Sequence, residues 1–206
     1  MAETACYKGT IFTMGLLCAA VGWLHGRGEA PSAEHVLSVS RRIAEAPLRA
    51  ELTQLKNASP RTHGEALLLR FGETGIRGEA AAGFPVISGC ALPALRASRR
   101  AGEARNEGNL NVLLHILLRL NDTNVLNRGG YDALHWLRSE AADILRAGGA
   151  ASPRGKLKTH ALNQACIRKN ISPGGSADIL AAALFLHALE MLPAAQGAEA
   201  PFLSEI

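Results

Sequence analysis

The chain has 206 residues, of which 48% are hydrophobic and 4% aromatic, and its formal net charge is +4. This hydrophobic content is enough for a real core and excludes global disorder. Ala and Leu number 66 against 16 for Val and Ile, a ratio that favours helices over sheets. Dispersed arginines and few aromatic stacking groups argue against a nucleic-acid partner and favour a phosphorylated small molecule. We therefore predict an all-α protein.

The most apolar run covers residues 11–24. It is too short to cross a bilayer, so it predicts a central helix and no membrane partner. The opening residues Met1-Ala2-Glu3-Thr4-Ala5 carry an acid where a signal peptide needs a basic start. Four cysteines without a close Cys or His partner indicate neither a zinc site nor a disulfide framework. The expected location is cytoplasmic.

Helix signals and breakers alternate along the whole chain. Ser32 and Ser172 are N-cap candidates, Pro173 suits a first helical position, and Gly148-Gly149 suits a helix end. No repeat or linker divides the sequence, so residues 1–206 are predicted to form a single domain of about eight helices. The predicted helices cover residues 8–25, 32–46, 63–71, 89–100, 108–121, 131–147, 156–169 and 173–192.

A polar segment at residues 121–130 separates two predicted helices. It gathers a carboxylate, amides, a hydroxyl and a guanidinium, from Asn121 and Asp122 through Arg128, and it closes with two glycines. A plain helix connection needs only a few turn-forming residues. This segment is therefore predicted to be a loop that carries chemistry.

A second polar segment spans residues 62–85. The glycines Gly72, Gly75 and Gly78 are expected to prevent a stable helix and to let backbone amides approach a ligand. Phosphate would suit such a loop, with Arg77 as a bidentate clamp. The segment matches neither a Walker loop nor a dinucleotide fingerprint, and a plain glycine-rich connection is an equal alternative.

A third polar segment, residues 170–178, opens the last predicted helix. Its unpaired N–H groups and paired glycines, Gly174 and Gly175, would suit an anion. The alternative is that Ser172 and Asp178 only cap the helix and complement its dipole.

Together and in this order, these segments resemble the triphosphoribosyl-dephospho-CoA synthase family. The resemblance covers nearly the whole chain and rests on five segments in register. The matching residues are Lys8-Gly9-Thr10-Ile11-Phe12 with 15–20, Thr62-His63-Gly64-Glu65, Gly75-Ile76-Arg77-Gly78-Glu79-Ala80 with Gly83-Phe84-Pro85, Asp122-Thr123-Asn124-Val125-Leu126 with Arg128-Gly129-Gly130, and residues 172–178.

The resemblance also marks two differences. The family pattern implies N-terminal segments of the Pro-Gly-Leu-Val-Asp and Asp-Met-Asp types that have no counterpart in this sequence, and it has Asn-Thr-His where this chain has Ala5-Cys6-Tyr7. The chain is therefore expected to correspond to the C-terminal two-thirds of the family. A truncated or diverged non-catalytic homologue with a helical nucleotide-binding scaffold is the alternative to a working enzyme. On the truncation hypothesis, Phe12, Leu16 and Trp23 should form an exposed patch.

The family resemblance implies a helical enzyme that moves the triphosphoribosyl unit of ATP onto the 2′-hydroxyl of 3′-dephospho-CoA and releases adenine. Its product is the prosthetic-group precursor for the acyl-carrier subunits of citrate lyase or malonate decarboxylase, so an acyl-carrier-protein transferase is a possible downstream partner. The oligomeric state is left open. The reaction passes through an oxocarbenium-like centre that needs acid and base help, and the intact triphosphate needs cations, with Mg²⁺ expected.

These demands assign roles to the matching residues. Asp122 and Asp178 are the candidates for metal binding or general base, with Glu65 and Glu79 behind them. His63 is a candidate acid for the departing adenine, although a structural donor is the commoner role of such a histidine. The predicted phosphate clamps and nucleotide-binding residues are Lys8, Arg77, Gly78, Asn124, Arg128, Gly129, Ser172, Gly174, Gly175 and Ser176.

Overall fold

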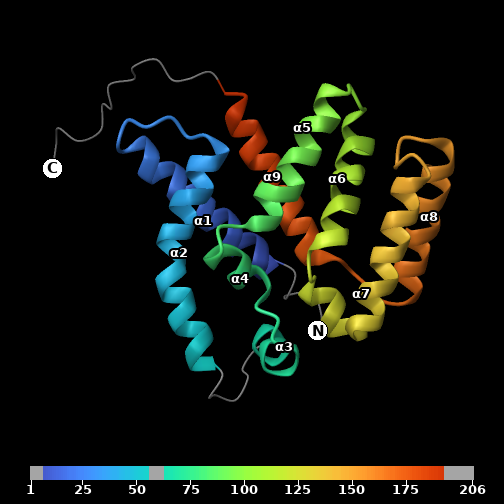
Figure 1. Ribbon diagram of the computed structural model, residues 1–206, viewed down its shortest axis with the longest axis horizontal. Helices are drawn as coiled ribbons and strands as arrows, with labels where there is room; N and C mark the ends of the chain where they lie inside the picture. Colours follow the sequence, from blue (N-terminus) through green and yellow to red (C-terminus); the bar gives the residue numbers. More distant parts are fainter. Residues whose placement is uncertain (1–6, 56–62, 193–206) are drawn as a thin grey trace.

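The computed structural model describes residues 7–55 and 63–192, which form α-helices and one π-helical turn, with no strand in those ranges (Figure 1). The all-α prediction is confirmed. The elements in chain order are α1 Tyr7–His25, α2 Ala33–Leu55, α3 His63–Phe71, α4 Gly75–Ala81, the π-helical turn η1 Ile87–Ala91, α5 Leu92–Arg100, α6 Arg105–Arg119, α7 Thr123–Arg146, α8 Pro153–Arg168 and α9 Gly174–Glu190.

The glycine-rich segment between α3 and α5 is where the prediction of a loop is wrong. Residues Gly75–Ala81 form the short helix α4 despite Gly75 and Gly78. Its last turn carries Ala80 and Ala81, which are 0% and 8% exposed and belong to the core beside α2. Burial of this face against neighbouring helices outweighs the low helix propensity of the glycines.

The polar segment at 121–130 is also helical rather than a loop. α7 begins at Thr123 with Asp122 as its N-cap, and the helix is interrupted at Gly130, whose φ of 64° and ψ of −163° are not helical. Glycine adopts this conformation without the steric cost that a side chain would bring. The kink divides α7 into a short first part, which begins at the pocket described below, and a long second part.

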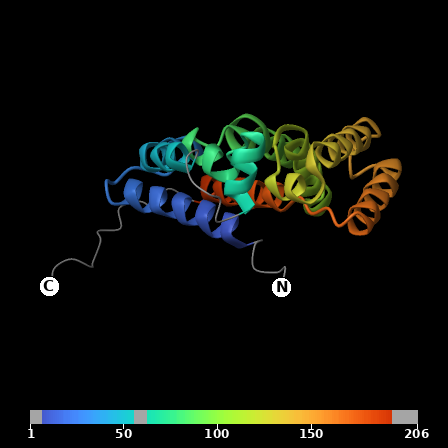
Figure 2. The same ribbon diagram turned by 90° about the horizontal axis from the view of Figure 1, so that it is seen from below.

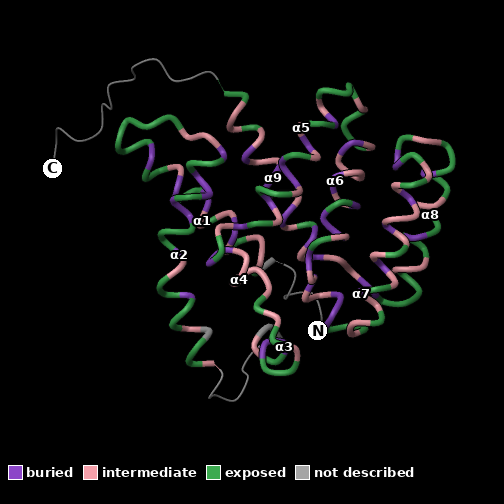
Figure 3. The backbone as a smooth tube through the Cα atoms, in the orientation of Figure 1, coloured by how far each residue is buried: buried purple, intermediate pink, exposed green. Residues whose placement is uncertain are grey.

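Two apolar clusters form the core, and α6 contributes to both. The larger cluster joins α1, α2, α5 and α9, while the smaller one joins α3, α7 and α8. α9 packs against α1, α2, α5, α6 and α7, so it is the central helix of the fold. Figure 3 shows exposed positions along the outer sides of α2 and α8.

The prediction that the first apolar run forms a helix is confirmed by α1, but its predicted central position is wrong. Leu17 and Leu24 of α1 are buried in the larger cluster, but Ile11 on the opposite side is 70% exposed, and Figure 2 shows α1 along one edge of the molecule. Of the residues expected to form an exposed patch, Trp23 is exposed, under the guanidinium groups of Arg27 and Arg42. Phe12 and Leu16 are instead partly buried against the core.

None of the described helices combines the length and apolar character that a membrane span requires.

Candidate functional site

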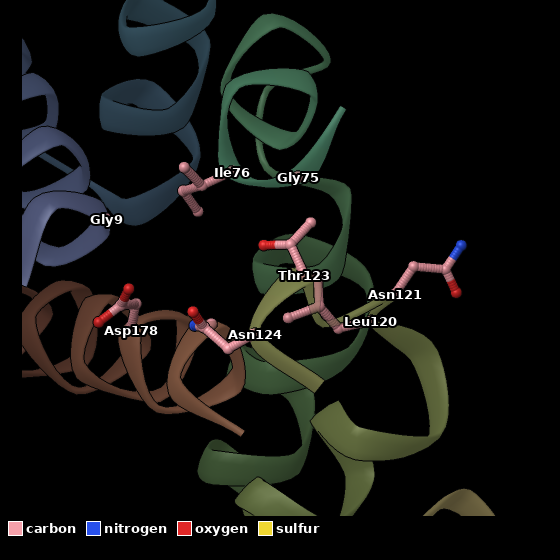
Figure 4. Close-up of a pocket in the computed structure, with 9 residues that line it drawn as sticks. Gly9, Gly75, Ile76, Leu120, Asn121, Thr123, Asn124 and Asp178 are labelled. Carbon is pink, nitrogen blue, oxygen red and sulfur yellow. The ribbon is translucent and has the colours of Figure 1, made fainter. Parts of the chain in front are cut away.

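A pocket of about 150 Å³ lies where several helices begin (Figure 4). Its walls come from the first turns of α1, α4, α7 and α9 and from the connection between α6 and α7. The three polar segments therefore meet at one pocket, with the start of α1 as a fourth contributor. The lining residues are Gly9, Gly75, Ile76, Leu120, Asn121, Thr123, Asn124, Gly175 and Asp178.

Glycines at the pocket allow the helix starts to approach one another closely. A Cβ on Gly9 would lie 2.4 Å from Oδ2 of Asp178, and a Cβ on Gly75 would lie 3.0 Å from Cγ2 of Thr123. Gly75 also has a φ of +55°, which favours glycine. A Cβ on Gly175 would lie 3.3 Å from the Asp122 carboxylate. Side chains at these positions would close the gaps between the helices.

The start of α9 offers backbone donors to this space. Among the residues that the structure describes, the N–H groups of Gly174 and Gly175 have no hydrogen-bond partner, whereas that of Ser176 donates to Asp122. α9 is 17 residues long, so its first turn carries the partial positive charge of a full helix dipole. Unpaired N–H groups at such a turn are suited to an anion.

Asp122 joins the starts of α7 and α9. Its Oδ1 accepts from the N–H groups of Asn124 at 2.9 Å and Val125 at 3.3 Å, and its Oδ2 accepts from the N–H and the hydroxyl of Ser176 at 2.7 and 2.8 Å. The side chain is 1% exposed. Burial raises the pKa of Asp122, and the hydrogen bonds from Ser176, Asn124 and Val125 lower it. Both oxygens are engaged by these four donors, and the role of Asp122 as metal ligand or base stays a prediction.

Asp178 is placed differently, because its carboxylate faces the pocket (Figure 4). Its Oδ1 accepts a hydrogen bond from the Thr10 hydroxyl, and Oδ2 lies close to Gly9. Burial raises the pKa of Asp178, the Thr10 hydrogen bond lowers it, and the negative charge of Asp122 raises it. A half-buried carboxylate with one oxygen toward the pocket can accept a proton or contact a cation.

Two neighbouring side chains complete the polar wall. Figure 4 shows Thr123 and Asn124 projecting from the first turn of α7 into the space that Asp178 faces. Asn124 was among the predicted nucleotide-binding residues, as was Gly175. Gly9 and Thr123 were part of the matching segments but received no predicted role, and Gly75 was expected only to let backbone amides approach a ligand.

The predicted phosphate clamps do not line the pocket. The Arg77 guanidinium forms an ion pair with the carboxylate of Glu51 in α2, with Nη1 and Oε1 2.6 Å apart. Its neighbour in the sequence, Ile76, does line the pocket. Arg128 donates to the backbone and side-chain oxygens of Asn170 at 3.1 and 2.8 Å, so it fixes the turn before α9. Lys8 is exposed at the start of α1.

Other predicted residues have structural contacts. Glu79 accepts from the N–H of Val86 at 3.1 Å, and burial raises the pKa of its carboxyl. A Cβ on Gly78 would overlap the Thr74 hydroxyl, and one on Gly129 would lie 2.5 Å from Cβ of Ala133, so both glycines permit close packing.

The remaining predicted residues lie near the pocket or outside its lining. Ser172 is half-buried in the turn before α9. Glu65 is half-buried in α3 and is not part of the lining. His63 begins α3, but its side chain lies outside the described part of the structure, as do Ala5 and Cys6.

Taken alone, the fold and the pocket define an all-helical protein with a glycine-rich pocket where several helices begin. The chain belongs to the ATP:dephospho-CoA triphosphoribosyl transferase (CitG) family, whose model matches residues 1–196. This confirms the family resemblance found in the sequence.

Curated relatives support the assignment. The chain is 39% identical over 180 residues to the "Probable 2-(5''-triphosphoribosyl)-3'-dephosphocoenzyme-A synthase" of Citrobacter koseri, covering 87% of this chain and 59% of the relative. It is 39% identical over 181 residues to the 2-(5''-triphosphoribosyl)-3'-dephosphocoenzyme-A synthase of Pectobacterium atrosepticum, covering 88% and 58%. A Vibrio cholerae relative is 35% identical over 186 residues. The chain thus spans about 59% of the length of the first of these relatives. No solved structure matches it.

Proposed function

We propose that this chain contributes the active-site pocket of an enzyme that transfers the triphosphoribosyl unit of ATP to the 2′-hydroxyl of 3′-dephospho-CoA and releases adenine. The observation that carries the proposal is the convergence of Gly9, Thr123, Gly175 and Asp178 on one pocket in a member of this family. The names of the relatives give no support to the alternative of a non-catalytic homologue.

The triphosphate would bind at the helix starts. The N–H groups of Gly174 and Gly175, the Thr123 hydroxyl and the Asn124 amide supply donors from two directions. Backbone and amide donors suit phosphate oxygens. By binding the triphosphate without cleaving it, they would also hold the attached ribose in place. Arg77 and Arg128 would act indirectly in this scheme, by fixing α4 against α2 and the turn before α9.

Mg²⁺ fits the pocket only in part. The described residues include no group of three or more His, Cys, Asp or Glu side chains placed to hold a metal, and Asp178 is the one carboxylate among the lining residues. Mg²⁺ characteristically binds through one or two carboxylates together with substrate phosphates and water. Asp178 and the side-chain oxygen of Asn124 would hold it here. Bound Mg²⁺ would neutralise charge on the triphosphate.

Asp178 is also our candidate for the general base. The reaction needs a group that takes the proton of the incoming 2′-hydroxyl as the bond from the ribose to adenine breaks. The raised pKa of Asp178 suits proton transfer near neutral pH better than that of an exposed aspartate. Thr10 orients the carboxylate through its hydrogen bond.

The test is release of adenine from ATP in the presence of 3′-dephospho-CoA and Mg²⁺, followed by chromatography. We expect adenine and the triphosphoribosylated product in equal amounts. The control is the Pectobacterium atrosepticum relative under the same conditions. Product from that relative together with none from this chain would contradict the proposal.

A further inference from the structure

A chain of side-chain hydrogen bonds lies behind the pocket, formed by Glu73, Asn121, Tyr131 and Arg138. Oε1 of Glu73 accepts from the Asn121 amide at 2.8 Å and from the Tyr131 hydroxyl at 2.7 Å. The Arg138 guanidinium donates to Oδ1 of Asn121 at 2.6 Å and to the backbone oxygen of Leu120 at 3.2 Å. Both ends of the Asn121 amide are therefore engaged.

The charges on either side give the Asn121 amide one orientation. The anionic Glu73 takes the NH₂ group, and the cationic Arg138 takes the oxygen. Rotating the amide by 180° would point its NH₂ group at the Arg138 guanidinium and its oxygen at the Glu73 carboxylate. Both charge-assisted hydrogen bonds would then be lost. Figure 4 shows the Asn121 side chain directed away from Thr123 and Asp178, so its backbone borders the pocket while its side chain is held from behind.

These residues come from three separate segments. Glu73 precedes α4 by two residues, Asn121 lies between α6 and α7, and Tyr131 and Arg138 lie in the second part of α7. Tyr131 and Arg138 are two helical turns apart and share one face. Tyr131 directly follows the kink at Gly130, and Phe71 packs edge-on against the Tyr131 ring with the ring centroids 5.3 Å apart.

Two of the connected segments contribute neighbouring parts of the pocket wall. Gly75 and Ile76 lie two and three residues after Glu73, and Thr123 and Asn124 lie two and three residues after Asn121. We infer that Glu73, through Asn121 and Arg138, positions the α4 wall of the pocket against the α7 wall. Tyr131 supplies the second donor that holds the Glu73 carboxylate. This role concerns the shape of the pocket and does not depend on the proposed reaction.

The same molecule offers a matched control at the far end of α6. Glu103 accepts from the Asn111 amide at 3.3 and 3.2 Å and from the Ser98 hydroxyl at 2.8 Å, and Oδ1 of Asn111 accepts from the N–H of Ala150. This is also a Glu–Asn pair that joins separate segments. None of its members lines the pocket.

The first measurement is amide hydrogen exchange by mass spectrometry, which needs no ligand. In Glu73→Ala we expect exchange of the peptides covering 75–81 and 120–126 to accelerate at least about tenfold relative to the rest of the chain. Glu103→Ala should leave these peptides within about twofold of wild type. Glu73→Gln, which keeps an acceptor for Asn121 and Tyr131, should restore most of the protection. Equal acceleration in the Glu73 and Glu103 variants would overturn the inference.

The second measurement is binding of inorganic triphosphate by calorimetry. Glu73→Ala should weaken binding about tenfold, and Tyr131→Phe by a smaller factor, while Glu103→Ala should have no more than a twofold effect. Should Glu73→Ala fail to fold, Tyr131→Phe provides the comparison with Glu103→Ala in exchange and binding, while Glu73→Gln stays the conservative control. Wild-type protection and binding in Tyr131→Phe, and in Glu73→Ala where it folds, would overturn the inference. Absence of triphosphate binding by the wild type would count against the proposed function, while the exchange result would still test the positioning role.

Discussion

The carboxylate of Asp122 accepts two hydrogen bonds from Ser176, one from its backbone N–H at 2.7 Å and one from its hydroxyl at 2.8 Å. These bonds connect the start of α7 to the start of α9 across 54 residues of sequence. They place Thr123 and Asn124 beside Gly175 and Asp178 in one pocket. The pocket therefore depends on a buried residue that does not itself line it.

Ser176→Ala tests this connection. The buried Asp122 would keep the backbone donor but lose the hydroxyl, so we expect unfolding free energy to fall by about 1–3 kcal/mol. Chemical denaturation measures the change. Ser40→Ala is the control, because Ser40 is equally buried but its hydroxyl has no partner in the described structure. A similar loss in both variants would show that the Asp122 bond contributes nothing specific.

Gly9→Ala tests the close approach of α1 to Asp178. A Cβ at this position would lie 2.4 Å from Oδ2 of Asp178, so the carboxylate or the helix must move. We expect adenine release to fall at least about tenfold, since the reacting group loses its position. Gly15→Ala in the same helix meets no atom within 4 Å and should stabilise the protein by about 0.5–1 kcal/mol. Wild-type activity in Gly9→Ala would contradict this account.

Asp178→Asn separates the two roles given to Asp178. If Asp178 is the general base, the substitution should lower the rate of adenine release by about 10²–10⁴-fold, while the affinity for ATP with Mg²⁺ changes little. If Asp178 is a metal ligand, the substitution should weaken that affinity as well. Calorimetric titration with and without Mg²⁺ distinguishes the roles. If neither rate nor affinity changes, Asp178 has no part in the reaction.

The pH dependence of adenine release follows from the burial of Asp178. The active form is deprotonated, so activity falls as the pH drops through the pKa of this group, which burial raises. In a plot of the rate of adenine release against pH, the fall on the acid side (the acid limb) should therefore lie at higher pH than it would for an exposed aspartate. Thr10→Val removes a hydrogen bond that lowers this pKa, so it should move the limb upward, whereas Thr10→Ser should restore it.

The control for the pH profile is Thr13→Val in the same helix. The Thr13 hydroxyl is buried and has no partner in the described structure, so its removal should leave the limb in place. An identical profile for Thr10→Val and the wild type would show that Asp178 is not the titrating group.

The sequence predicted the helical class and identified the three polar segments that line the pocket, because caps, glycines and apolar spacing are local signals. It also assigned Asp178, Asn124 and Gly175 to the site. It could not predict the partners of Arg77 and Arg128, since Glu51 and Asn170 lie 26 and 42 residues away in the chain. An arginine in a recognised segment has the same local signature whether it binds a phosphate or a neighbouring helix.

Asp122 and α4 show the same limit. In the sequence, Asp122 and Asp178 are both carboxylates at polar helix starts. Only the burial of Asp122 and its hydrogen bonds from Ser176 distinguish them. α4 was predicted to be a loop because glycine propensity is local, whereas the burial of Ala80 and Ala81 is set by the tertiary fold. Glu73 and Tyr131 gave no signal in the sequence, since their role depends on the kink at Gly130.

The central claim is that the triphosphate binds at the helix starts rather than at the exposed arginines. The most direct measurement is a titration of the ¹⁵N-labelled chain with inorganic triphosphate, followed by amide NMR. We predict the largest shifts at Gly9, Thr123, Gly174 and Gly175. Shifts concentrated around Arg77 and Arg128, with these four amides unchanged, would contradict it.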